Sequence, residues 1–118
     1  MTETSPAKLA DQAAEAIRAL NHATLATGRD DWEFPSNAYD VIGGLDRMAG
    51  GLDQALGQVW SLLAKLATAG HVTSDRGDAN RDLDDARSAL DAARAAADQL
   101  VTALSRAHSA TSPLAYKA

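Results

Sequence analysis

The stretch VIGGLDRMAGGLDQALG, Val41 to Gly57, repeats itself with a step of seven residues. Val-Ile-Gly-Gly-Leu-Asp-Arg is followed by Met-Ala-Gly-Gly-Leu-Asp-Gln, and a seven-residue step is typical of packed helices. Glycine is the poorest helix former after proline, yet this stretch holds five glycines. The repeat therefore predicts a helix, and its glycines need an explanation of their own.

The apolar pattern extends this helix in both directions. Apolar residues recur at alternating steps of three and four from Ile42 to Leu66, which predicts one long helix over residues 38–69. Ser36 or Asn37 is the expected N-cap. A second apolar row flanks the first: Val41, Met48, Ala55 and Leu62. The apolar face is broader than one neighbouring helix requires, so this helix should be the central element.

A shorter helix is expected before it, over residues 6–27. Ser5 precedes a proline that suits the first helical position, where its missing N–H costs nothing. Leucine, isoleucine and alanine then recur at helical spacing, and Gly28 is a fitting C-terminal stop.

A third helix is expected over residues 79–109, with Asp78 as its cap and a frayed tail over 110–118. The short turn before it makes the two long helices antiparallel neighbours. Facing residues should have numbers that sum to about 149, which sets Leu56 opposite Ala93 and pairs large side chains with small ones. The sequence therefore predicts an all-α fold, an antiparallel hairpin plus an N-terminal helix in a three-helix bundle able to dimerise.

The same register makes two finer predictions. Val59 should face Leu90 across the hairpin. Arg87 and Arg94 each have an aspartate four residues later and should form ion pairs on the solvent side of the last helix.

The glycines at one heptad position, Gly43, Gly50 and Gly57, lie off the leucine seam. Each costs about 1 kcal/mol relative to alanine, so their regular spacing leaves three explanations open. They form a groove that the first helix or a partner subunit approaches closely, or they mark a break near Ala49 to Gly51, or they are incidental.

Composition narrows the function. The chain has 118 residues, no cysteine and a net charge of −5. This length fits one domain, and the lack of cysteine excludes disulfides, thiolate metal sites and cysteine nucleophiles. The acidic charge argues against nucleic acid, which binds clustered lysine and arginine, and no apolar run is long enough to cross a bilayer. We expect a single cytoplasmic domain that binds neither nucleic acid nor membrane.

No catalytic or cofactor-binding residue stands out. The three histidines fall in different elements, without a second histidine at metal-ligand spacing. One acidic group has helical spacing: Asp75, Asp78, Asp82 and Asp85. A metal-dependent helical hydrolase is one interpretation of it, but a capping residue followed by acids favoured by the helix dipole explains the group without a metal. We therefore predict no metal, no cofactor and no enzymatic activity.

Aromatic side chains are the remaining candidates. Trp32 and Phe34 lie in the loop before the long helix, and Tyr39 lies just inside it. They either cover one end of the bundle or form an exposed patch for a partner or a small molecule, because aromatic residues anchor interfaces. Trp60, off the seam in mid-helix, covers the first helix or faces another subunit.

Two stretches carry a resemblance, AAEAIRALNHATL (13–25) and WEFPSNAYDVIGGLDRMAGGLDQAL (32–56). They resemble a group of small, alanine-rich, uncharacterised actinobacterial proteins associated with plasmids or integrated elements. The resemblance implies an all-helical fold and brings no activity with it. The leading interpretation is thus a non-enzymatic helical protein–protein interaction module, a homodimer or a small subunit of another protein. A small-molecule-binding regulatory domain near Trp32 and Phe34 is the alternative.

Overall fold

The computed structural model describes residues 4–25 and 32–118, and this part of the chain is helical without a β-strand. Its helices are α1 (Pro6–Ala23), α2 (Pro35–Gly50), α3 (Leu52–Thr68) and α4 (Ala79–Thr111). The predicted all-α class is confirmed. The chain divides into two compact units, residues 1–33 with α1 and residues 34–118 with α2, α3 and α4, where we predicted one domain. The packing of α1 against the other helices stays a prediction.

Helix α1 begins as its sequence predicts and ends early. The hydroxyl of Ser5 accepts a hydrogen bond from the backbone N–H of Lys8 at 3.2 Å. The helix ends at Ala23, where the hydroxyl of Thr24 donates to the carbonyl of Leu20 at 2.9 Å. Such side-chain bonds to the last carbonyls compete with continuation of the helix. Gly28, the predicted stop, lies outside the described residues.

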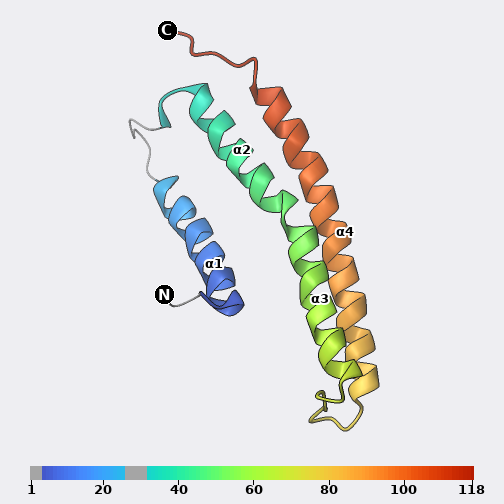
Figure 1. Ribbon diagram of the computed structural model, residues 1–118. Coiled ribbons are helices and arrows are strands. Elements are labelled where there is room, and N and C mark those ends of the chain that lie inside the picture. Colours follow the sequence, from blue (N-terminus) through green and yellow to red (C-terminus); the bar gives the residue numbers. More distant parts are fainter. Residues whose placement is uncertain (1–3, 26–31) are drawn as a thin grey trace. The chain divides into compact units, whose positions relative to one another are not determined.

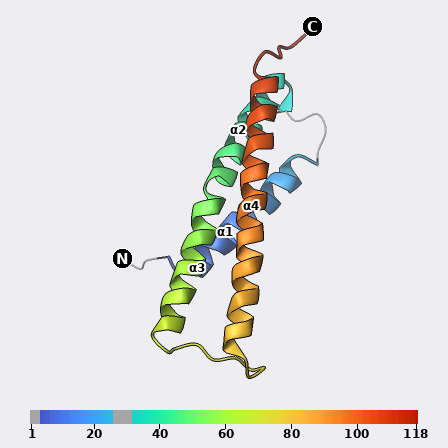
Figure 2. The same cartoon turned by 90° about the vertical axis from the view of Figure 1, so that its right-hand side faces the viewer.

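Helices α2 and α3 follow one another along α4 and run antiparallel to it (Figures 1 and 2). Four side-chain pairs define the register: Tyr39 with His108, Asp46 with Ser105, Asp53 with Arg94, and Trp60 with Arg87. The residue numbers of every pair sum to 149 within two. The predicted hairpin and its register are therefore confirmed.

The prediction of a single long helix over residues 38–69 is wrong, because the helix is interrupted at Gly51. The N–H of Gly51 bonds to the carbonyl of Met48, three residues back, at 3.1 Å instead of continuing the α-helical pattern. Two successive glycines weaken the helix here, and kinks concentrate at such positions. The break skips only one residue, so the apolar periodicity passes through it unchanged. One of the three explanations for the glycines thus applies to Gly51.

The ends of the hairpin helices also differ from prediction in part. Helix α2 begins at Pro35, and the side chain of Asn37 accepts from the backbone N–H of Phe34 at 2.8 Å. Asn37 therefore secures the first turn from inside the helix rather than as its N-cap. The cap of α4 is confirmed, since Asp78 accepts from the N–H of Arg81 at 3.0 Å.

The hairpin has a very small core. Among the described residues, the buried apolar side chains are those of Ala49, 1% exposed, and Ala97, 7% exposed. No large side chain is fully buried in this part of the chain. Val59, predicted to face Leu90, is 54% exposed, so it lies at the edge of the helix contact and not within it. The alanines bring the helix axes close together, and the larger side chains remain at the edges of the contact.

Candidate interaction surface

In the α2 half of the hairpin, the imidazole of His108 packs against Gly43 and Tyr39. The ring of His108, from α4, stacks on Tyr39 with centroids 4.0 Å apart and planes 19° from parallel. A Cβ atom built on Gly43 would come within 2.9 Å of His108 Nε2, closer than such atoms approach. Gly43 therefore provides the space that the imidazole occupies.

The α3 half repeats this arrangement with a guanidinium. Arg94 Nε donates to Asp53 Oδ1 at 2.6 Å, and a Cβ atom on Gly57 would lie 3.2 Å from Arg94 Cζ. The hydrogen bond and charge of Asp53 raise the pKa of the Arg94 guanidinium above its usual value. We predicted that Arg94 pairs with Asp98 on the solvent side. That prediction is wrong, because the arginine reaches across to α3.

Two of the three glycines are thus explained within the chain itself. One of the three explanations was a groove that the first helix or a partner subunit approaches, whereas Gly43 and Gly57 face side chains of α4. Gly50 is different, since a Cβ atom on it would meet nothing within 4 Å. Of the three glycines at this heptad position, Gly43 and Gly57 therefore pack against α4, whereas Gly50 faces open space.

Trp60 lies on the same flank of the hairpin as Arg94. The guanidinium of Arg87, from α4, lies 6.0 Å from the centroid of the Trp60 ring. This contact satisfies a cation–π geometry and leaves Trp60 half-buried. Arg87, which we expected to pair with Asp91, lies over the indole and remains exposed to solvent.

The two aromatic residues of the loop, Trp32 and Phe34, belong to different compact units. Phe34 packs edge-on against Tyr116 with centroids 5.2 Å apart, so the C-terminal tail folds back on the start of α2 rather than fraying throughout. Phe34 and Tyr39 thus cover the α2 end of the hairpin. Trp32 belongs to the first unit and is 46% exposed.

The opposite flank of the hairpin is apolar and exposed. One member lies on α2, three follow helical spacing on α3, and one lies on α4. We call these residues the apolar face: Met48, Val59, Leu62, Leu66 and Leu100. Leu62 is 60% exposed and Leu66 is 50% exposed. At about 100° per residue, Leu62 and Leu66 lie on the side of α3 away from Asp53 and Gly57.

A stripe of alanines on α4 continues the apolar face. On the helical wheel these residues lie away from the flank that carries Arg87 and Arg94. We call them the alanine stripe: Ala89, Ala92, Ala96 and Ala103. All four are exposed. One side of the hairpin is therefore a ridge of large side chains beside a row of small ones.

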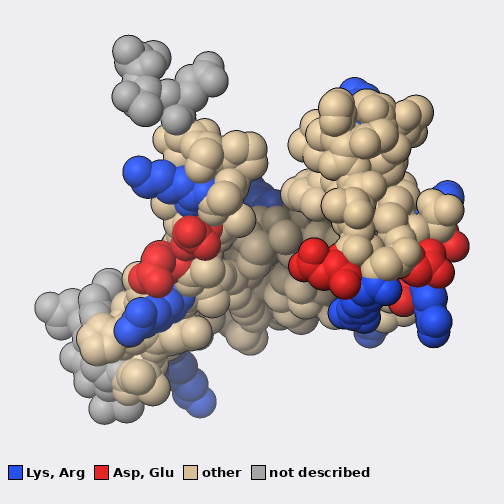
Figure 3. Space-filling view, turned by 90° about the horizontal axis from the view of Figure 1, so that it is seen from below, with Lys and Arg blue, Asp and Glu red and all other residues tan. Residues whose placement is uncertain are grey.

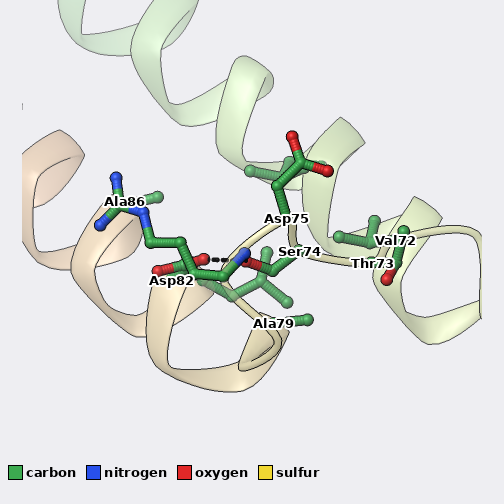
Figure 4. A pocket seen from close by; sticks show the side chains of 10 residues that line it. Val72, Thr73, Ser74, Asp75, Ala79, Asp82 and Ala86 are labelled. Carbon is green, nitrogen blue, oxygen red and sulfur yellow. Dashed lines mark hydrogen bonds between the residues drawn. The ribbon is translucent and has the colours of Figure 1, made fainter.

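The end of the hairpin at the α3–α4 turn holds an open hollow of about 360 Å³ (Figure 4). Leu63, Leu83 and Ala86 are among its apolar lining residues, and the turn supplies its rim. The hydroxyl of Ser74 donates to the carboxylate of Asp82, while Asp75 points away from this pair (Figure 4). No buried polar group is aimed into the hollow in the described part, so it resembles a surface recess.

Two of the four aspartates that suggested a metal site have local structural roles. Asp78 caps α4 and Asp82 accepts a hydrogen bond from Ser74. Within residues 4–25 and 32–118, no group of three acidic or histidine side chains is arranged to hold a metal ion. Seen from below, acidic and basic side chains intermix without a large area of one sign (Figure 3). The geometry gives the metal interpretation no support.

Sequence reasoning missed His108, Asp53 and Arg94 as contact residues. The register contained the signal, because numbers that sum to about 149 place Asp53 near Arg94 and the first turns of α2 near His108. Our assignment of Arg94 to the solvent side of the last helix obscured it.

No membrane-spanning helix occurs in the described part of the chain. Comparison with protein-family models, with curated proteins and with solved structures gives no match. The resemblance to small actinobacterial proteins therefore stays a prediction, and the function rests on the surface alone.

Proposed function

We propose that this chain is a non-enzymatic helical association module, and that it self-associates through the apolar face. The observation that carries the proposal is the contrast in burial. Leu62, Leu66 and Val59 are half or more exposed, whereas only two alanines form the buried apolar core of the described residues. A helical layer of this kind requires a second layer against its apolar side.

Burial of the apolar face against a second copy is energetically favourable. Burying a leucine or valine side chain contributes about 1.5–3 kcal/mol, and the apolar face offers five large exposed residues on one flank of the hairpin. Isolated exposed leucines are ordinary, but a contiguous apolar surface marks an interaction site. The expected cytoplasmic location belongs to the same proposal, and it rests on the lack of cysteine.

The competing functions have less support. The recesses found among the described residues are lined by neither Trp32 nor Phe34, and the hollow near Leu63 lies at the other end of the hairpin from Phe34. A hydrolase lacks the cluster of ligands that its metal requires, as far as the described residues go. Association is the function that the exposed side chains favour.

The test compares two variants of matched exposure. Leu62→Ser combined with Leu66→Ser should convert the dimer to a monomer, because it removes the centre of the apolar face. Leu114→Ser changes a leucine of the tail that is 58% exposed, and it should leave the dimer intact. Molar mass from light scattering measures assembly, and circular dichroism measures helix content.

The outcomes separate clearly. A dimeric wild type and control with a monomeric double variant supports the proposal. A double variant that keeps the wild-type mass, or a wild type that is monomeric throughout, contradicts self-association through this face. Loss of helix in the double variant alone supports it when the loss disappears at high protein concentration, as linkage between folding and assembly requires.

A further inference from the structure

Resting on the proposed function, we infer how the two copies meet: α3 of each copy lies over α4 of the other, related by a two-fold axis parallel to the helices. We call the large exposed side chains of α3 the ridge: Val59, Leu62 and Leu66. In this arrangement the ridge of one copy packs on the alanine stripe of its partner. The edge of each contact is then an ion pair between Lys65 of one copy and Asp85 of the other.

The shape of the apolar face favours this occupant. A two-fold interface uses the same surface twice, so that surface must be complementary to itself. Along the α3 half of the hairpin, the large side chains Val59, Leu62 and Leu66 lie on α3, whereas the α4 side of the face carries alanines. Turning the hairpin about an axis along its length exchanges the two sides, which places ridge on stripe. Large residues then oppose small ones, as interdigitated helix packing requires.

The other two-fold arrangement is less favourable. An axis perpendicular to the helices places α3 on α3 and α4 on α4. Leu62 and Leu66 would then meet a second ridge, and the alanine stripe would meet a second alanine stripe. The leucines would hold the helices apart where the alanines would leave a gap, and unfilled gaps lose contacts.

Charge complementarity supplies the second, independent argument. Lys65 is the only basic residue of α3, and it lies on the helical wheel at the outer edge of the ridge, beyond Leu62. The register sets residue 65 level with residue 84 of α4, where exposed Asp85 continues the row of the alanine stripe one turn before Ala89. The axis parallel to the helices places the outer edge of α3 in one copy beside this end of the stripe in the other. Opposite charges therefore meet twice in the dimer.

Asp85 lines a small hollow with two arginines and two aspartates of its own chain: Arg76, Arg81, Asp78 and Asp82. Together with Asp85, these residues carry three negative charges and two positive ones. A basic side chain from another copy is therefore favourable at this edge.

The first experiment uses the fact that the chain has no cysteine. Lys65→Cys and isotope-labelled Asp85→Cys are mixed, allowed to exchange, and treated with a short bismaleimide that joins neighbouring helices. We expect a crosslinked species that contains one labelled and one unlabelled chain. Ser61→Cys mixed with Asp85→Cys is the matched control, because Ser61 lies one turn from Lys65 on the solvent side of α3, and it should give no such species.

The second experiment reverses the charges. Lys65→Glu should weaken the dimer about three- to tenfold, because two like-charge contacts replace two ion pairs. Asp85→Lys should do the same. The double variant should restore the dissociation constant to within about twofold of wild type. Sedimentation velocity measures all four proteins, and added salt should shrink the differences.

The outcomes distinguish the arrangement from the proposed function. A mixed crosslink with charge rescue supports both. A stable dimer in which residues 65 and 85 neither crosslink nor rescue overturns the arrangement and leaves self-association standing. Monomers at every concentration overturn both, and they point instead to α1 of the same chain or to a different protein as the occupant of the apolar face.

Discussion

The α2 and α3 halves of the hairpin pack on the same helix and differ in what they leave outside. Along α2, the contact is closed by Ala49, by Gly43 and by the stack of Tyr39 on His108. Along α3, Asp53, Gly57 and Trp60 engage arginines on one flank, while Val59, Leu62 and Leu66 remain exposed on the other.

This difference shows that residue size determines which side chains lie between two packed helices and which remain exposed beside them. Glycine and alanine allow two helices to approach, but they bury little apolar area of their own. Large residues beside them then have no room between the axes and stay at the edge. The α2 half leaves only Met48 and Leu100 of the apolar face exposed, whereas the α3 half presents its three most exposed members for a second layer.

The largest effect is expected where the close contact is filled. Ala49→Leu should lower the free energy of unfolding by about 3 kcal/mol, because it forces three extra carbons into a site that is 1% exposed. Ala95→Leu, on the exposed outer side of α4, should change it by less than about 0.5 kcal/mol. Denaturant titration measures both. Equal effects would show that the α2 half is not closely packed.

A smaller effect separates the glycines of the heptad. Gly50→Ala should raise the free energy of unfolding by about 1 kcal/mol, because the new methyl group meets nothing and alanine favours the helix. Gly43→Ala should gain nothing, because its Cβ displaces the imidazole of His108 from Tyr39.

Removing the imidazole tests that reason. In a His108→Ala background, Gly43→Ala should recover the gain seen at Gly50. If the gain is the same with and without the imidazole, the contact between Gly43 and His108 has no energetic role.

The smallest effect is expected at the ion pair on the α3 half. Asp53→Asn should lower the unfolding midpoint slightly, because both partners are about two-fifths exposed and solvent weakens their attraction. The loss should fade as salt is added. A loss as large as that of Ala49→Leu, or one insensitive to salt, would mean that the pair organises the hairpin.

Much of this fold follows from sequence, and the exceptions have physical causes. The span of α4, its Asp78 cap and the register of 149 come from apolar periodicity and capping chemistry, which act locally. The break at Gly51 does not, because an interruption of one residue preserves the periodicity on both sides. Glycine propensity allows a break without fixing its place.

The candidate site was harder to predict than the fold. The breadth of the apolar pattern indicated an association surface, and Met48 and Leu62 were already in its second row. The groove explanation for Gly43 and Gly57 did not anticipate His108 and Arg94, whose planar side-chain groups pack against these glycines. A long polar side chain can cover a helix and still reach water.

The central claim is that the apolar face is completed by a second copy of the chain. The most direct test is the unfolding midpoint of the wild-type protein at two concentrations about a hundredfold apart. Folding linked to assembly makes the midpoint rise with protein concentration, and we predict a rise of several degrees. A midpoint that stays the same at both concentrations would contradict the claim.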